Sequence, residues 1–256
     1  MRIVSWNINS LRRRESILLR WLGESKPDLL CLQETKCTDE QFPALGLRAA
    51  GYYCAFHGQK SYNGVAILSR SPLEDIQIAL GDDDEDSHAR VIAATVGQVR
   101  VYSVYAPNGQ AVGASAYTYK LKWYERLWQR LEEEERQRQY LAVCGDFNVA
   151  PTDNDVFDPE LWRGAIMCSV AERAAFDRLC SFPLVDTLRL HHREPGLFSW
   201  WDYRMQAFAK NRGLRIDAVL AGKALAARCT AAGVDRDLRE GPDASDHAPV
   251  WAEFDW

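Results

Sequence analysis

The sequence has 256 residues, of which 47% are hydrophobic and 26% are charged. This is an ordinary soluble composition, and the length allows a substantial core in one large domain or two small ones. The formal net charge of −5 argues against a polyanionic partner held by overall charge, but nine of the 36 carboxylates lie in two runs, at 82–86 and 132–135. Basic residues gather elsewhere, so local patches can still bind a polyanion.

The seven cysteines are scattered, without the paired spacing of a zinc site or a disulfide framework. This pattern is typical of the reducing cytosol. A strand-like run opens the sequence where a signal peptide would have its apolar core, and no apolar stretch approaches the roughly 18 residues of a membrane span. We therefore expect a cytoplasmic protein with no membrane partner.

Apolar runs bounded by turn residues predict a strand at 3–6 and, in chain order, strands at 29–32, 64–68, 90–96, 99–105, 141–144, 214–220 and 249–254. Ser10 is placed to cap a helix over 11–22, and helical periodicity predicts further helices at 114–138 and 169–181. Gly97-Gln98 between two strands predicts an antiparallel hairpin. No linker divides the chain. We expect one α/β domain over 1–256, with two packed mixed sheets and helices outside. Each half of the sequence has a helix between strands, which hints at an internal duplication.

One strand end carries a distinctive polar motif, Gly145-Asp146-Phe147-Asn148. Alternate side chains of an extended segment share a face, so Asp146 and Asn148 are expected to point one way and Phe147 the other. Gly145 allows the backbone to approach a neighbour closely. The carboxylate and the amide are suited to holding a water or a phosphate oxygen.

Other predicted strands end or begin in polar residues as well. The carboxylates at these positions are Glu34, Asp146, Asp217 and Asp246, and they are accompanied by Asn7, Asn9 and His247. A salt bridge or a turn explains one such carboxylate, whereas four favour a shared Mg²⁺ or Mn²⁺ ion. His247 beside Asp246, with Asp217 available for its other nitrogen, becomes a candidate acid or charge stabiliser.

These motifs together resemble those of the exonuclease III family, the bacterial-type abasic-site endonucleases of the endonuclease/exonuclease/phosphatase superfamily. The segments concerned are 7–10, 32–36, 63–67, 105–109, 145–148, 199–204, 214–217 and 245–250, and their order and spacing fit over the whole chain. The resemblance implies a four-layer α/β sandwich. It also implies a Mg²⁺ cofactor, which Mn²⁺ can replace, and a double-stranded DNA substrate with abasic sites or blocked 3′ ends.

The resemblance implies a catalytic group of Tyr105, Asp146, Asn148, Asp217 and His247, and a metal group of Glu34, Asn7 and Asp246. Glu34 would ligate the ion, with the other two nearby. Asp146 would orient or deprotonate the attacking water, and Asn148 would hold that water and a phosphate oxygen. His247, paired with Asp217, would bind the scissile phosphate. Tyr105 would contact the phosphate or assist the nucleophile.

The resemblance also implies a set of substrate contacts, at Tyr62, Asn108, Trp200, Arg212, Leu214 and Ile216. Trp200, Leu214 and Ile216 would surround the base-less sugar, although Trp200 and Trp201 can equally be core residues. Tyr62 and Arg212 would contact the DNA backbone, with ordinary loop polarity as the alternative explanation.

The predicted function is a Mg²⁺-dependent nuclease of base excision repair, acting as an abasic-site endonuclease with 3′→5′ exonuclease and 3′-end trimming activity, in that order. We expect a monomer. One alternative is a superfamily phosphatase acting on a small phosphoester. Another is a non-catalytic DNA-binding module, which would give no reason for the joint presence of four residues: Glu34, Asp146, Asp217 and His247.

Overall fold

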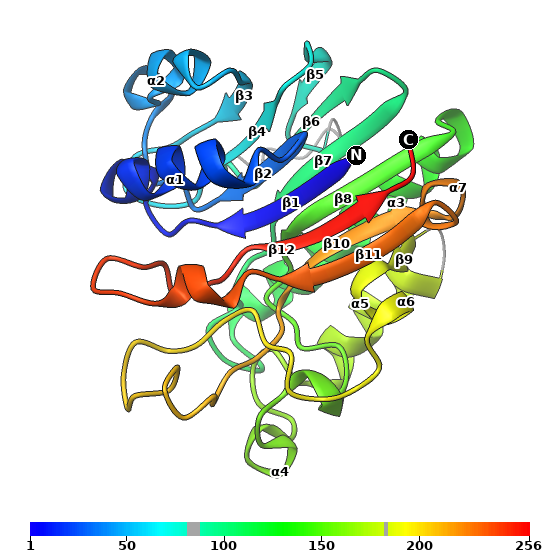
Figure 1. The fold of residues 1–256 in the computed structure, drawn as a ribbon. Coiled ribbons are helices and arrows are strands. Elements are labelled where there is room, and N and C mark those ends of the chain that lie inside the picture. Colours follow the sequence, from blue (N-terminus) through cyan, green and yellow to red (C-terminus); the bar gives the residue numbers. More distant parts are fainter. Residues whose placement is uncertain (81–87, 182–183) are drawn as a thin grey trace.

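Two six-stranded mixed sheets pack face to face in the computed structural model, which describes residues 1–80, 88–181 and 184–256 (Figure 1). The first sheet contains β1 (Arg2–Asn7), β2 (Leu29–Gln33), β3 (Tyr53–His57), β4 (Val65–Ser69), β11 (Cys229–Val234) and β12 (Val250–Phe254). The second contains β5 (Glu74–Ile78), β6 (Val91–Val96), β7 (Val99–Tyr105), β8 (Tyr140–Asp146), β9 (Leu184–Asp186) and β10 (Asp217–Gly222).

Helices cover the outer faces of both sheets. These are α1 (Leu11–Ser25) and α2 (Ala44–Ala49) on the first sheet, and α3 (Ser115–Gln137) and α5 (Val170–Ser181) on the second. The short helices α6 (Thr187–His191) and α7 (Lys223–Ala226) add side chains to the cluster between the sheets, and α4 (Pro159–Trp162) lies in the loops beyond the strands (Figure 1). Short 3₁₀ turns lie at Asp39–Gln41, Asp153–Asp155 and Arg236–Arg239. Among the described residues no helix is long and apolar enough to cross a membrane.

The core has three main parts, which correspond to the interfaces between layers. Side chains such as Cys31 and Cys144 fill the space between the sheets. Trp6 and Leu18 belong to the cluster under α1, and Phe147 and Leu127 to the cluster under α3 and α5. The predicted four-layer sandwich of two mixed sheets between helices is therefore confirmed.

The two sheets pair their strands in the same pattern. Their orders are β11-β12-β1-β2-β4-β3 and β5-β6-β7-β8-β10-β9, and in each only the central pair, β1–β2 or β7–β8, is parallel. A helix joins the strands of each parallel pair, α1 in the first sheet and α3 in the second. This repeated topology agrees with the duplication suggested by the sequence.

Several local predictions are confirmed and others are wrong. The hairpin at Gly97 is confirmed by the antiparallel pairing of Val96 with Val99. Ser10 does not cap α1, because its φ of 86° turns the chain and its side chain makes no capping bond. The strand predicted over 214–220 begins only at Asp217, which is therefore a strand end and not an interruption. The acidic run at 82–86 lies outside the described residues.

Both parallel pairs direct their carboxyl ends to one edge of the sandwich. Asn7 ends β1 and Gln33 ends β2, while Tyr105 and Asp146 end β7 and β8. The antiparallel β10 begins at this edge, with Asp217 opposite Asp146 in the register. Asn7, Asp146 and Asp217 are nonetheless buried, so each requires a hydrogen-bond partner within the site.

Candidate active site

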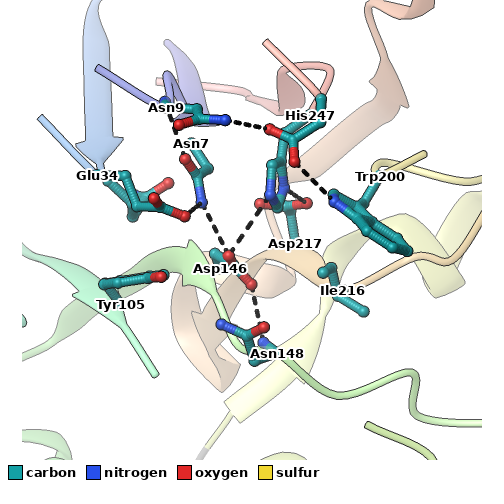
Figure 2. Close-up of polar contacts among 12 residues, drawn as sticks. Asn7, Asn9, Glu34, Tyr105, Asp146, Asn148, Trp200, Ile216, Asp217 and His247 are labelled. Carbon is teal, nitrogen blue, oxygen red and sulfur yellow. Dashed lines mark hydrogen bonds and ion pairs between the residues drawn. The ribbon is translucent and has the colours of Figure 1, made fainter. Parts of the chain in front are cut away.

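The strand-end side chains singled out in the sequence converge at this edge (Figure 2). Asn7, Glu34 and Asn9 come from the first sheet, and Tyr105 and Asp146 from the second. Asn7 Nδ2 joins the two halves, because it donates to Glu34 Oε1 (2.8 Å) and to Asp146 Oδ2 (2.9 Å). The contact links β1 of one sheet with β8 of the other.

Asp146 and Asn148 face the same site, but a turn brings them there and not strand alternation. The strand ends at Asp146, and Asn148 has a φ of 50°, which asparagine adopts more readily than most residues. Asn148 N donates to Asp146 Oδ1 (2.8 Å), closing an Asx-type turn. Phe147 packs inward against Phe176, with ring centroids 5.3 Å apart. Gly145 is required because an added Cβ would lie 2.2 Å from the Val104 carbonyl oxygen.

His247 and Asp217 form a buried pair. His247 Nδ1 lies 2.9 Å from Asp217 Oδ2, and its Nε2 lies 3.8 Å from Asp146 Oδ2. Burial alone would lower the pKa of His247, but Asp217 and then Asp146 raise it to about 10. The imidazole is therefore a cation at neutral pH, held beside the site with one nitrogen occupied.

Ser199 is a partner of this pair that sequence reasoning missed. Its hydroxyl donates to Asp217 Oδ2 (2.6 Å), and it accepts from the backbone nitrogens of Ile216 and Asp217 (both 3.1 Å). The same Asp217 oxygen thus receives the serine and the histidine. Ser199 directly precedes Trp200 in the 199–204 motif, but a buried serine carries no distinctive signal.

Asp146 has the electrostatics of a base. Burial raises its pKa, and the neighbouring Asp217 raises it further, to about 7, against the opposing effect of His247. Such a carboxylate can accept a proton near neutral pH. The Asn7 side chain and the backbone nitrogen of Asn148 each bind one oxygen of Asp146, which fixes the orientation of the carboxylate.

Lys36 and Asn9 complete the side of the site around Glu34. Lys36 Nζ contacts Glu34 Oε2 (2.7 Å) and donates to Asn9 Oδ1 (2.6 Å). Asn9 Nδ2 donates to Asp246 Oδ1 (2.8 Å), and Asp246 Oδ2 accepts from Trp200 Nε1 (3.1 Å). Lys36 was part of the matched 32–36 segment, but its contact with the carboxylate was not expected.

The donor set fits a divalent cation. Glu34, Asp146 and His247 each offer one ligand atom, and these atoms lie within 4.8 Å of one another. The oxygen donors are the hard ligands that Mg²⁺ and Mn²⁺ prefer, and carboxylates at the site outnumber its cationic side chains. One nitrogen of His247 is already engaged by Asp217, and Mg²⁺ prefers oxygen, so the oxygens of Glu34 and Asp146 are the better ligands.

Asn7 and Asp246, expected near the ion, make different contacts. Asn7 presents its amide nitrogen to the carboxylates, while its Oδ1 accepts from Asn9 N (3.0 Å). In this arrangement Asn7 holds the two carboxylates through its nitrogen, while its oxygen is bonded to the backbone of Asn9. Asp246 is not one of the three groups above; its carboxylate is bonded to Asn9 and Trp200.

Tyr105 lies beside Glu34 and Asp146 at the end of β7 (Figure 2). Burial raises the pKa of its hydroxyl well above the usual value, and the two carboxylates raise it further. Arg90 lies over the ring, 5.0 Å from its centroid. The hydroxyl stays protonated and can donate a hydrogen bond, which favours contact with a phosphate oxygen over activation of the nucleophile.

A mostly apolar cavity of about 630 Å³ lies beside Trp200. Its walls include Trp162, Met205 and Arg212, so the structure places two of the predicted substrate contacts, Trp200 and Arg212, on one hollow. The other tryptophan of the pair, Trp201, is fully buried in the core.

The remaining predicted substrate contacts differ in exposure. Leu214 and Ile216 are buried in a cluster that includes Met167 and touches Trp200, so they form a floor under it. Tyr62 is exposed. Asn108 is exposed and donates through Nδ2 to Asn148 Oδ1 (3.2 Å), which connects it with the site.

Comparisons with known proteins agree with this geometry. The model of the Endonuclease/Exonuclease/phosphatase family matches residues 4–247. The exodeoxyribonuclease III of Haemophilus influenzae is 37% identical, with 99% of this chain and 100% of that protein covered. The exodeoxyribonuclease of Bacillus subtilis is 34% identical, with 98% of each covered.

Solved structures show the same similarity over the full length. The 3′ phosphatase NExo from Neisseria, bound to a product DNA hairpin, superposes with a TM-score of 0.98 at 43% identity, with all of both chains covered. An AP endonuclease from Archaeoglobus fulgidus superposes with a TM-score of 0.95 at 36% identity, again with all of both chains covered.

Proposed function

Because the chain belongs to the endonuclease/exonuclease/phosphatase family, we propose that it is a metal-dependent DNA-repair nuclease that hydrolyses phosphodiesters at abasic sites and at blocked 3′ ends. It is a hydrolase of the exodeoxyribonuclease III and AP endonuclease type. The observation that carries the proposal is the buried Asp217–His247 pair facing Asp146 at 3.8 Å. This arrangement supplies both a base for water and a cation for a phosphate.

Asp146 is the proposed base for the attacking water. Its pKa near 7 is close to the working pH, where a general base is most effective. The hydrogen bonds from the Asn7 side chain and from the backbone nitrogen of Asn148 hold the carboxylate in one orientation toward the site. A base held in this way accepts the proton without reorganising during the reaction.

The scissile phosphate is proposed to lie between His247 and Tyr105. His247 carries a positive charge and has Nε2 free of Asp217, so it can donate to a phosphate oxygen. Tyr105 is neutral and can donate as well. Donors of this kind stabilise the charge that develops on the pentacovalent transition state, and one missing donor can cost on the order of 10²–10³ in rate.

We propose Mg²⁺ as the cofactor, held by Glu34 with Asp146 adjacent, and Mn²⁺ as a substitute for it. When bound, the ion supplies Lewis-acid neutralisation of the phosphate and of the leaving 3′ oxygen. Lys36 contacts the second oxygen of Glu34 and so orients the carboxylate. Asp246 and Asn9 are proposed to support this side of the site through their mutual bond.

Double-stranded DNA is the proposed substrate, and the base-less sugar is proposed to lie beside Trp200. The indole borders the cavity and is bonded to Asp246, so it can pack against a sugar without moving. Leu214 and Ile216 act from below as an apolar support. Tyr62 and Arg212 are proposed to contact the backbone.

Three DNA reactions are compatible with one site. The Neisseria relative is described as a 3′ phosphatase and as a 3′–5′ exonuclease, and the Archaeoglobus relative as an AP endonuclease. We propose abasic-site incision as the leading activity, followed by exonuclease action and 3′-end trimming. Hydrolysis of a small phosphoester is the alternative from the same superfamily.

The test uses three duplexes of one sequence, carrying an abasic site, a recessed 3′-hydroxyl or a 3′-phosphate. Each is incubated with pure protein in Mg²⁺ or in EDTA, next to inositol phosphate as the small phosphoester. We expect Mg²⁺-dependent hydrolysis of DNA, fastest at the abasic site. Absence of cleavage on all three duplexes would refute the nuclease, and release of phosphate from the small phosphoester alone would favour the alternative.

A further inference from the structure

A buried lysine lies directly beneath the proposed site. Lys120 is on α3, its side chain has no solvent exposure, and its Nζ is 2.5 Å from Glu172 Oε1. The same ammonium donates to the backbone oxygens of Asn108 (3.1 Å) and Asn148 (2.7 Å). An ammonium has three N–H donors, and here each has an acceptor.

The two carbonyls that Lys120 holds belong to residues whose side chains enter the site. Asn108 Nδ2 donates to Asn148 Oδ1 (3.2 Å), and Asn148 Nδ2 donates to the Ala106 carbonyl (2.9 Å). Asn148 also has the left-handed φ of 50° that its turn with Asp146 requires. Its backbone must therefore be held in an uncommon conformation, and the ammonium binds it there.

Glu172 extends the contact to a third segment. Its Oε1 accepts from Met167 N (3.0 Å), and its Oε2 accepts from Ser169 N (3.1 Å) and Ser169 Oγ (2.6 Å). Met167 belongs to the cluster under Trp200. The ion pair thus joins the loops after β7 and β8 with the start of α5.

Stability alone is a poor reason for this ion pair. Burial disfavours the charged lysine and lowers its pKa, although Glu172 opposes the effect. Buried ion pairs can often be replaced by apolar residues without loss of stability. A methionine at this position would fill similar space but would leave two carbonyls without their donor.

We propose that Lys120 is a positioning residue for the phosphodiester hydrolysis. By binding the backbone oxygens of Asn148 and Asn108, it fixes the positions of their side-chain amides in the site. This inference rests on the proposed function, because the effect of Lys120 is measured as the rate of DNA hydrolysis. Lys120 itself is buried and does not touch the substrate. Small displacements matter in such sites, since a misplacement of about 1 Å can cost on the order of 10²-fold in rate.

The test compares the double variant Lys120→Met/Glu172→Gln with the wild-type protein, so that no buried charge is left unpaired. Glu134→Gln is the matched control, because Glu134 is a buried carboxylate of the same helix, bonded to Tyr102 OH (2.8 Å) and about 21 Å further along the axis. We expect kcat on abasic DNA to fall about tenfold to 10²-fold in the double variant. We expect less than about a threefold change in DNA affinity, and kcat within about twofold for the control.

A double-mutant cycle separates positioning from a purely structural role. Addition of Lys120→Met/Glu172→Gln to Asn148→Ala should lower kcat by less than about threefold, because the Asn148 side chain, to which the Asn108 amide is also bonded, is already removed. Equal losses of kcat in both backgrounds, or a folded double variant with wild-type kcat, would overturn the inference. If the double variant does not fold, Glu172→Gln, which leaves the Lys120 ammonium on both carbonyls, should retain more kcat than Lys120→Arg, whose planar guanidinium cannot repeat the same bonds, and the reverse order would overturn the inference.

The outcome for the wild-type protein distinguishes this inference from the proposed function. An active wild-type protein with an unaffected double variant refutes the positioning role alone. A wild-type protein that cleaves no DNA in Mg²⁺ refutes the nuclease, and the positioning role with it.

Discussion

Asp217→Asn is the substitution that tests the electrostatic argument most sharply. The side chain keeps its shape, so it can still accept from His247 Nδ1 and contact Ser199, but it loses the charge that contributes most to the raised pKa of the imidazole. That pKa is about 10 in the native site, against an ordinary value of about 6.5. We expect it to fall toward the ordinary value of about 6.5, because burial is then opposed only by Asp146 and Asp246.

The direction of the pH dependence follows from the charge that the site needs. His247 supports the phosphate when protonated, so in the wild-type protein this contribution persists up to a pH of about 10 and is lost above it. In Asp217→Asn it should be lost as the pH rises through about 6.5. At pH 8 only about 3% of an imidazole of that pKa is protonated, so kcat should fall roughly 30-fold, with a smaller loss at pH 6.

The assay is the pH–rate profile of abasic-duplex cleavage at saturating DNA for both proteins. Asp235→Asn serves as the control, because Asp235 pairs with Arg2 (3.3 Å) on the far end of β1 from the site. Its profile should match that of the wild-type protein. An Asp217→Asn protein with an unchanged thermal midpoint and an unchanged alkaline limb would refute the role given to the pair.

Three further substitutions or conditions test other parts of the account. Asp146→Asn should lower kcat by on the order of 10²–10³, measured by single-turnover cleavage, because the base for the attacking water is removed. DNA affinity, measured by fluorescence anisotropy, should stay within about threefold. A loss of affinity with an intact rate would contradict the role of Asp146 as a base. Gly145→Ala should lower the thermal midpoint by roughly 5–10 °C in calorimetry, because the added Cβ would lie 2.2 Å from the Val104 carbonyl oxygen. Gly23→Ala is the control and should not lower the midpoint, because no atom lies within 4 Å of the Cβ it would add. DNA affinity should fall about tenfold or more between 50 and 200 mM salt, and a flat response in the same anisotropy titration would indicate a small, weakly charged substrate.

The central part of the fold was predictable from the sequence because its strands are long apolar runs. β1, β2, β7 and β8 are buried on both faces and are bounded by turn residues, so their positions and the helices between them follow from the pattern. The edge strands β3, β5, β9 and β11 were not predicted. Their sequences are short, polar or interrupted, and pairing with a neighbour makes them strands, which local propensity does not reveal.

The convergence of polar side chains from several strand ends was predictable, whereas the contacts between them, and the participation of Ser199, were not. Carboxylates at strand ends can be recognised as candidate site residues from the sequence, because a buried, unpaired charge costs free energy and so indicates a partner such as a metal ion. The orientation of Asn7 toward two carboxylates depends on the approach of the two sheets, which no local pattern contains. Lys120 had a usable signal, since it occupies the buried stripe of α3 between Tyr117 and Tyr124, where an apolar residue is expected.

A crystal structure with Mn²⁺ and a duplex containing one abasic site tests the central claim most directly. We expect an anomalous peak at the Glu34 carboxylate, a phosphate within hydrogen-bond distance of His247 Nε2, and a water at Asp146. Mn²⁺ bound away from Glu34, or a scissile phosphate beyond the reach of His247, would contradict it.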